Sequence, residues 1–228
     1  MLRSEMQEML RTIEMETRMT QGFTGVAALR PEVMEAMASV PRHEFVPEHL
    51  RHHAYANSPL PIGNGQTISQ PFIVALMTDL LCPEPDDVVL EVGGGCGYQA
   101  AVLSRLVSKV YSVEIIPSLA RDTAHRLQKL GYHNVEVRQG DGYDGCPEHA
   151  PFDAIIVTAA VSSVPRPLQE QLRPGGRLVL PVGFPHAVQE LMVVEKKKDK
   201  SIVSRNVLSV AFVPLTGGHE NSGPGRAS

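Results

Sequence analysis

The residues with the most informative spacing are an acidic residue and a run of glycines near the middle of the chain. Glu91 is followed by Gly93, Gly94, Gly95 and Gly97. Glycine lets the backbone approach a ligand closely and adopt positive φ angles without strain from a Cβ atom. The dinucleotide fingerprint needs its third glycine five positions after the first, and Tyr98 stands there instead, so the spacing disfavours a dinucleotide. The run therefore predicts a turn that holds another small ligand, although glycine-rich turns also occur for purely structural reasons.

Two further carboxylates stand where the polar groups of a nucleoside could be bound. Glu114 lies about 20 residues beyond the glycine turn, the spacing at which a carboxylate accepts hydrogen bonds from ribose hydroxyls. Asp141 lies between two glycines, where its carboxylate could accept from an adenine amino group. Each residue also has a plainer interpretation, as a surface carboxylate before a helix or as a turn aspartate with a local backbone bond. The glycine turn upstream favours ligand binding for both.

Each of these residues follows a short apolar run that predicts a buried strand. Strands are expected over residues 88–90, 109–113, 135–138, 153–157 and 177–180, with helices over 71–81, 98–106, 117–130 and 168–172. Two more strands, over residues 190–195 and 206–212, are expected to form a hairpin across a solvated, lysine-rich turn. This alternation predicts an α/β fold: a doubly wound Rossmann-like sheet with an N-terminal helical extension and a C-terminal antiparallel hairpin. Ligands of such sheets bind beyond the carboxyl ends of the strands, where all the candidate residues fall.

The first 70 residues are expected to precede this core. Apolar residues at helical spacing predict an amphipathic helix over 2–19, and a second helix is expected to begin near Pro31. Residues 41–71 are rich in proline, glycine and histidine and predict a structured loop with at most brief helix. One domain is expected over residues 1–216, divided into the helices and substrate or cofactor loop (1–70) and the core (71–216), with a flexible tail over 217–228.

Composition limits the class of partner and the compartment. The chain has 228 residues, a net charge of −4 and 43% apolar residues, so no general attraction to nucleic acid or to an anionic membrane is expected. Its three cysteines include no CxxC pair, which argues against a disulfide framework or a zinc site and favours a reducing cytoplasm. His49, His52 and His53 lack acidic or cysteine partners, so we expect a loop or helix surface there instead of a metal site.

An ordered set of motifs extends over nearly the whole chain. The spacing E-x-G-x-G-x-G is the pattern of class I S-adenosylmethionine (AdoMet) methyltransferases. Beside it stand VPRHEFVP, PLPIGNGQ, TISQP, GDG, APFDAIIVTAA, QLRPGGRLVLPVG and FVPLT. Together they resemble the protein-L-isoaspartate (D-aspartate) O-methyltransferase family over roughly residues 5–216. The resemblance implies methyl transfer from AdoMet to the free α-carboxylate of an isoaspartyl residue in a damaged protein, with S-adenosyl-L-homocysteine as product. The ester then collapses to a succinimide, whose hydrolysis regenerates some normal aspartate. The resemblance also implies a monomer.

The resemblance assigns roles to particular residues. Ser69 matches the active-site serine, and the run Gln66, Thr67, Ile68 and Ser69 is expected to lie against the cofactor. The remaining matched cofactor positions are Glu91, Gly93, Gly95, Gly97, Glu114, Asp141, Gly142 and Thr216. Many relatives read G-T-G-S-G in the turn, where this chain has Gly94 and Cys96, so a hydroxyl donor is lost at each position and weaker binding is expected.

The chemistry needs few protein groups. A substrate carboxylate is already ionised at pH 7, so no general base is required. Ser69 is expected to orient that carboxylate as a hydrogen-bond donor, and Cys96 to act as a small filler of the turn. Arg42 and Tyr55, in the loop before the core, could touch the peptide substrate.

Two other functions remain open at this stage. The same scaffold could esterify another peptide or small-molecule carboxylate, or it could bind AdoMet without turnover.

Overall fold

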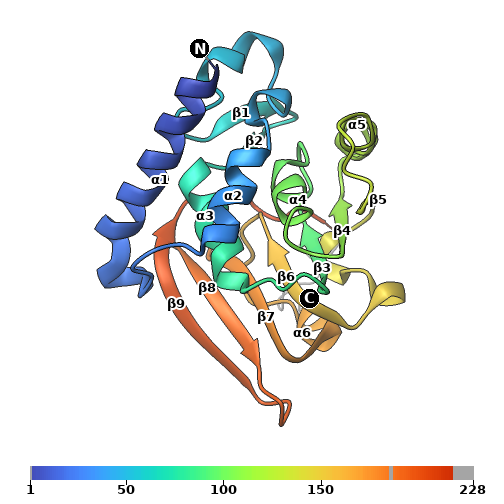
Figure 1. The fold of residues 1–228 in the computed structure, drawn as a ribbon. Helices are drawn as coiled ribbons and strands as arrows, with labels where there is room; N and C mark the ends of the chain where they lie inside the picture. The colour runs from blue at the N-terminus through green and yellow to red at the C-terminus, as the bar shows by residue number, and fades with distance from the viewer. Residues whose placement is uncertain (1, 185–186, 218–228) are drawn as a thin grey trace.

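A central sheet organises the molecule, which is described here by a computed structural model over residues 2–184 and 187–217 (Figure 1). Its strands are β3 (Val88–Val92), β4 (Lys109–Glu114), β5 (Val135–Gln139), β6 (Phe152–Val157), β7 (Leu172–Val182), β8 (Gln189–Lys196) and β9 (Ile202–Val210). Their spatial order is β5-β4-β3-β6-β7-β8-β9; the first five are mutually parallel, and β8 and β9 are antiparallel. The predicted Rossmann-like sheet with its C-terminal hairpin is confirmed. Apart from Gly217, the predicted tail over 217–228 lies outside the described residues.

The strand order reverses at β3. The chain runs from β3 outward through β4 to β5, then returns to place β6 on the other side of β3. Diverging connections leave a crevice at the carboxyl ends of β3 and β6, which is where open α/β sheets bind ligands. The glycine turn directly follows β3 and therefore lies at this crevice.

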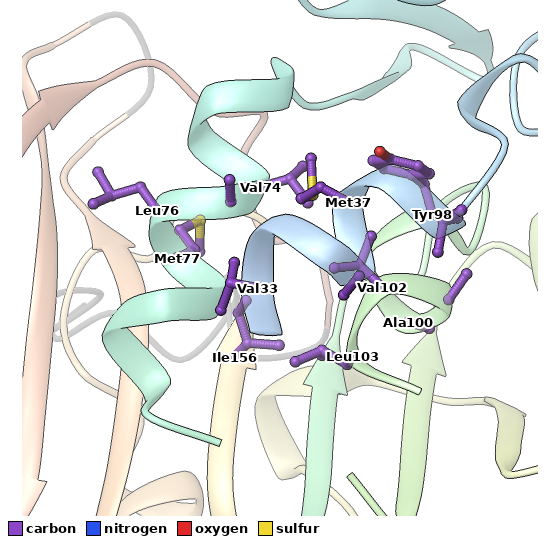
Figure 2. Close-up of a cluster of buried hydrophobic side chains, with 14 of the residues drawn as sticks. Val33, Met37, Val74, Leu76, Met77, Tyr98, Ala100, Val102, Leu103 and Ile156 are labelled. Atoms are coloured by element: carbon purple, nitrogen blue, oxygen red, sulfur yellow. The ribbon is translucent and has the colours of Figure 1, made fainter. Parts of the chain in front are cut away.

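Both faces of the sheet are covered, because its central strands are apolar on both sides. On β3, Val89 packs toward one hydrophobic cluster, whereas Leu90 and Val92 pack toward the other. The first cluster lies under α1 (Leu2–Thr24), α2 (Pro31–Ser39), α3 (Pro71–Leu81), α4 (Tyr98–Leu103) and part of α5 (Pro117–Lys129). The second lies under α6 (Arg166–Gln171). Figure 2 shows side chains of α2, α3 and α4 meeting Ile156 of β6 in the first cluster.

Helix α3 begins and ends as local sequence rules require. Pro71 occupies its first turn, where the missing N–H costs nothing. Cys82 ends it in a left-handed conformation, with φ of 50°, and donates its backbone N–H to the carbonyl of Asp79; Pro83 follows. The helix is buried on nearly every side, as its apolar sequence predicts.

The loop expected over residues 41–71 contains a hairpin that the sequence analysis missed. Strands β1 (Leu60–Gly63) and β2 (Gln66–Ile68) pair antiparallel across Asn64 and Gly65, which have φ of 53° and 71°. An Asn-Gly pair with both φ angles positive is the preferred two-residue hairpin turn, so the signal was present in the sequence. The brief helices η1 (Arg42–Glu44) and η2 (Glu48–His53) confirm the rest of that expectation.

Other boundaries differ from expectation by a few residues. α1 continues to Thr24, and α4 ends at Leu103 instead of Leu106. β9 begins at Ile202, four residues earlier than expected, because its polar residues pair through backbone atoms with β8 across the exposed lysine turn. Within the described ranges, no helix has both the length and the apolar character needed to cross a membrane.

Candidate cofactor and active site

A pocket opens at the carboxyl ends of β3 and β4, with about 750 Å³ of space not filled by protein atoms, part of it open solvent. Ten of the twelve sequence-predicted site residues line it: Gln66, Thr67, Ile68, Ser69, Glu91, Gly93, Gly95, Glu114, Gly142 and Thr216. They come from the β1–β2 hairpin, the glycine turn, the end of β4 and the C-terminal segment. Gly97 and Asp141 do not line the pocket.

The glycine turn is held on two sides. The N–H groups of Gly93 and Gly94 both donate to the carbonyl of Val113, at 2.9 and 3.2 Å, which ties the turn to β4. From α5, the Thr123 hydroxyl donates to the Gly95 carbonyl at 2.6 Å. A Cβ atom at Gly97 would lie 2.7 Å from Cγ2 of Thr123. The packing of α5 therefore requires glycine at position 97, and its predicted contact with the cofactor stays a prediction.

Gly94 and Cys96, the two positions at which the turn departs from the G-T-G-S-G pattern, are both closely surrounded by other residues. A Cβ at Gly94 would lie 2.5 Å from the Ser112 hydroxyl, so a larger residue at this position would require the Ser112 side chain to move. Cys96 is buried, and burial raises the pKa of its thiol. A neutral buried thiol is a poor nucleophile, so burial agrees with the prediction that Cys96 is a small filler of the turn.

Glu91 is the most perturbed group in the pocket. Its side chain is fully buried; Oε2 accepts a hydrogen bond from the Ser112 hydroxyl, and Oε1 has no hydrogen-bond partner. Burial raises the pKa of Glu91 to about 8, although the Ser112 hydrogen bond acts in the opposite direction, and the charge of Glu114 raises it further. A buried carboxyl oxygen without a partner is costly unless a ligand completes it.

Glu114 closes the glycine turn through backbone contacts. Its Oε2 accepts from the N–H of Gly95 at 2.7 Å, and its Oε1 accepts from the N–H of Ile116 at 2.8 Å. A carboxylate has about four lone-pair positions, so each oxygen can still accept one more hydrogen bond from a ligand hydroxyl.

Asp141 lies just outside the pocket. Its Oδ1 accepts from the N–H of Tyr143 at 3.0 Å and caps the short helix η3 (Gly142–Asp144). This is the local turn contact that its plainer interpretation describes. The predicted contact with an adenine amino group stays a prediction.

Arg42 positions the loop that carries Ser69. The fully buried guanidinium donates from Nη2 to the Ser69 carbonyl at 2.7 Å and from Nε to the Ala54 carbonyl at 2.8 Å. It lies 4.8 Å from the ring centroid of Tyr98. The expectation that Arg42 touches the peptide is therefore wrong, because the side chain is enclosed by the protein. Tyr55 is 7% exposed, and its hydroxyl lies 2.7 Å from Nδ1 of His43; a contact of Tyr55 with the peptide stays a prediction.

The sequence analysis missed Thr158, which follows β6 and lines the pocket. Its hydroxyl donates to the Gly93 carbonyl at 2.5 Å, so it links the end of β6 to the glycine turn. A polar residue directly after an apolar strand in this sheet is the signal that could have identified it.

The C-terminal segment forms the remaining wall. The N–H of Ala160 donates to the Val213 carbonyl, and the N–H of Leu215 donates to the Ala160 carbonyl, both at 2.8 Å. These bonds join residues 213–215 to the loop after β6 and bring Thr216 to the pocket rim.

Metal-ligating groups are scarce in the described part of the chain. His49, His52 and His53 are exposed on η2. Only Cys146, Glu148 and His149 bring ligand atoms within 4.8 Å of one another there. Glu148 is ion-paired with Arg138, and burial, then the charge of Glu148, raises the pKa of the Cys146 thiol. Both features disfavour a bound cation.

Comparison with known proteins identifies the family. A sequence model of protein-L-isoaspartate (D-aspartate) O-methyltransferase matches residues 17–220. The chain belongs to this family. A protein-L-isoaspartate O-methyltransferase 2 of Nitrosococcus oceani is 61% identical over 213 residues, which cover 93% of this chain and 97% of the relative. The protein of the same description from Syntrophobacter fumaroxidans is 59% identical over 212 residues, covering 93% and 86%.

Solved structures agree with this family assignment. One protein-L-isoaspartate O-methyltransferase superposes with a TM-score of 0.79 at 29% identity, covering 93% of this chain and 66% of its own. A Plasmodium falciparum protein described as a beta-aspartate methyltransferase, solved with S-adenosyl-L-homocysteine, gives a TM-score of 0.72 at 23% identity and covers 90% and 97%. The second likeness shows the shared fold.

Proposed function

We propose that this chain is a protein-L-isoaspartate O-methyltransferase. It transfers the methyl group of AdoMet to the free carboxylate of L-isoaspartyl and D-aspartyl residues in damaged proteins and so initiates their repair, releasing S-adenosyl-L-homocysteine. One observation supports this proposal most directly. In this member of the family, a single pocket is lined by the Ser69 loop, the glycine turn, Glu91 and Glu114.

The pocket suits AdoMet on two structural counts. Oε1 of Glu91 is a buried acceptor without a partner, and both oxygens of Glu114 keep capacity for ligand hydroxyls. The proposal assigns Gln66, Thr67, Ile68, Gly93, Gly95, Gly142 and Thr216 to the surrounding wall, with Gly97 and Asp141 supporting it from behind. AdoMet supplies the hard chemistry, a methyl group already activated by its sulfonium sulfur.

The chain's own residues then have a modest task, which is to place the substrate carboxylate and exclude water. Ser69 would donate its hydroxyl hydrogen bond to one carboxylate oxygen. None of the described residues lining the pocket is lysine, arginine or histidine. This supports the proposal, because a cation paired with the carboxylate would lower its nucleophilicity, and no base is needed for a group already ionised at pH 7.

The proposal also includes the cellular compartment, the oligomeric state and the domain boundaries of the enzyme. We place it in the cytoplasm as a monomeric enzyme whose domain comprises residues 1–216. The described cysteines support a reducing compartment, since Cys82, Cys96 and Cys146 are all free thiols. Residues from both the loop before the core and the core line one pocket, which supports treating them as one domain.

A matched pair of peptides that differ only in aspartyl or isoaspartyl linkage tests the proposal. With labelled AdoMet, we expect methylation of the isoaspartyl peptide alone. If neither peptide is methylated while AdoMet binds, the substrate is another carboxylate or turnover is absent, and the proposed function is rejected.

The role of Ser69 is tested by Ser69→Ala. Loss of one hydrogen bond to a charged group should lower the rate of methyl transfer about 10- to 100-fold while AdoMet affinity stays nearly constant. Ser201→Ala, in the exposed lysine turn, is the matched control and should change neither quantity. An unchanged rate in Ser69→Ala would remove Ser69 from the active site.

A further inference from the structure

A second hollow adjoins the candidate active site on the side of the Ser69 loop. It is bounded by α1, by the start of α3 and by residues 208–213 at the end of β9, with about 1250 Å³ of unfilled space, open solvent included. Figure 1 shows α1 beside β9 at this edge of the sheet. We call this hollow the flanking groove. It shares Thr67, Ser69, Thr158 and Val213 with the pocket, so the two hollows lie side by side at the Ser69 loop.

This adjacency bears on what the groove can hold. A polypeptide whose carboxylate reaches Ser69 carries backbone and side chains on either side of the reacting residue. Because Ser69 lines both hollows, the groove is within reach of one of those flanking segments. Phe72, Ile73 and Phe212 give the groove apolar walls for the stems of long side chains.

The charge of the flanking groove comes from a carboxylate. Among the described residues that line it, Glu16 of α1 alone is ionisable. The side chain of Asn57 holds it in place, because Nδ2 donates to Oε1 of Glu16 at 3.5 Å while Oδ1 accepts from the N–H of Phe72 at 3.2 Å. Neighbouring acids on the same helix are neutralised, as in the pair of Glu14 with Arg18, whereas no ion pair of the described residues involves Glu16.

We propose that the flanking groove binds the substrate segment next to the reacting residue and that Glu16 selects a lysine or arginine side chain in that segment. The inference rests on the proposed function, since it presumes a peptide substrate at Ser69. A basic side chain would lay its stem along the apolar wall and bring its charge to a carboxylate that has no ion pair with any described residue. An exposed pair of this kind changes affinity by about two- to fivefold.

The test uses the whole enzyme and a set of isoaspartyl peptides of one length. Each carries lysine, glutamine or glutamate at one of the three positions before or after the isoaspartyl residue. At one position or two adjacent positions, we expect lysine to lower KM about two- to fivefold relative to glutamine, with kcat unchanged, and glutamate to raise KM. The difference should shrink as ionic strength rises.

Variants of Glu16 test whether this residue causes the preference for lysine. Glu16→Gln should abolish the distinction between lysine and glutamate peptides, and Glu16→Lys should invert it. Glu14→Gln, on the same helix but outside the groove, is the matched control and should retain the wild-type preference. AdoMet affinity serves as the readout of folding in every variant.

The outcomes separate the two proposals. Equal KM for all charges at every position, or a preference that survives Glu16→Gln, overturns the role of Glu16 while leaving the proposed function intact. Failure to methylate every isoaspartyl peptide, the neutral ones included, overturns the proposed function and this inference with it.

Discussion

At the scale of single residues, the most informative group is Glu91, a carboxyl at the end of a central strand. Fully buried acids are uncommon, because removing the charged form from water costs several kcal/mol unless it is paired. Glu91 lines the pocket; its Oε2 accepts from the Ser112 hydroxyl, and its buried Oε1 has no hydrogen-bond partner. The ligand-free protein therefore favours the neutral acid, and the free oxygen is retained at the expense of stability.

Glu91→Gln tests this argument through the pH dependence of stability. The folded protein raises the pKa of Glu91 from 4.5 to about 8, so between those values the folded state holds a proton that the unfolded state has lost. The stability that the neutral acid contributes is present below pH 4.5 and is lost as pH rises toward about 8. Glutamine does not titrate. The unfolding free energy of the variant should therefore rise relative to that of wild type as pH increases from 4.5 to about 8. Urea unfolding of the ligand-free proteins at several pH values measures this, and parallel curves would contradict it.

At the scale of elements, the loop that ends in Ser69 is held by a buried arginine. Arg42 spans two carbonyls, of Ala54 and Ser69, and stacks on Tyr98. A planar guanidinium can donate hydrogen bonds to both carbonyls at once from different nitrogen atoms. The single ammonium group of a lysine cannot reproduce this geometry. The position of the active-site loop thus depends on a residue that contacts no substrate.

Arg42→Lys should loosen this loop. At least one buried carbonyl loses its donor, and we expect a loss of about 2–4 kcal/mol in unfolding free energy. Because Ser69 is then less well placed, kcat should fall while AdoMet affinity changes little. Denaturant unfolding and steady-state kinetics measure the two effects. Arg51→Lys, an exposed arginine paired with Glu44, is the control; equal behaviour of the two variants would reject the positioning role.

Elements also show how far the sequence could be interpreted. The glycine turn, its preceding strand and Glu114 could be predicted because their signals are local: spacing, apolar runs and strand ends. The β1–β2 hairpin was equally local, through Asn64 and Gly65, and was overlooked. By contrast, the contact of Gly97 with Thr123 and the bonds of Arg42 join residues far apart in the chain. Such contacts depend on how helices and loops pack, which no local pattern specifies.

At the scale of the whole molecule, the pocket is a junction of segments from most of the chain. The hairpin before the core, the turns after β3 and β4, the loop after β6 and residues 213–216 all contribute. A ligand that contacts them all binds the folded state only, so its binding free energy adds to the stability of the entire protein.

Thermal unfolding with AdoMet tests this coupling. At about 100 times its Kd, AdoMet should stabilise wild type by about 2.7 kcal/mol and raise Tm by about 5–10 °C. Gly95→Val should abolish the rise, because Gly95 lines the pocket with φ of 52°, a conformation that a β-branched residue rarely adopts, so the turn would have to change shape. Gly22→Ala, on a free surface of α1, should respond like wild type. A full Tm rise in Gly95→Val would contradict the assignment of the pocket.

The wall formed by residues 213–216 also affects when the pocket can form during folding. Because a chain is synthesised from its N-terminus, the hairpin and the glycine turn leave the ribosome before residues 213–216 do. Until they join the loop after β6, one side of the pocket is missing. One wall of the pocket therefore forms only after residues 213–216 have joined the loop after β6.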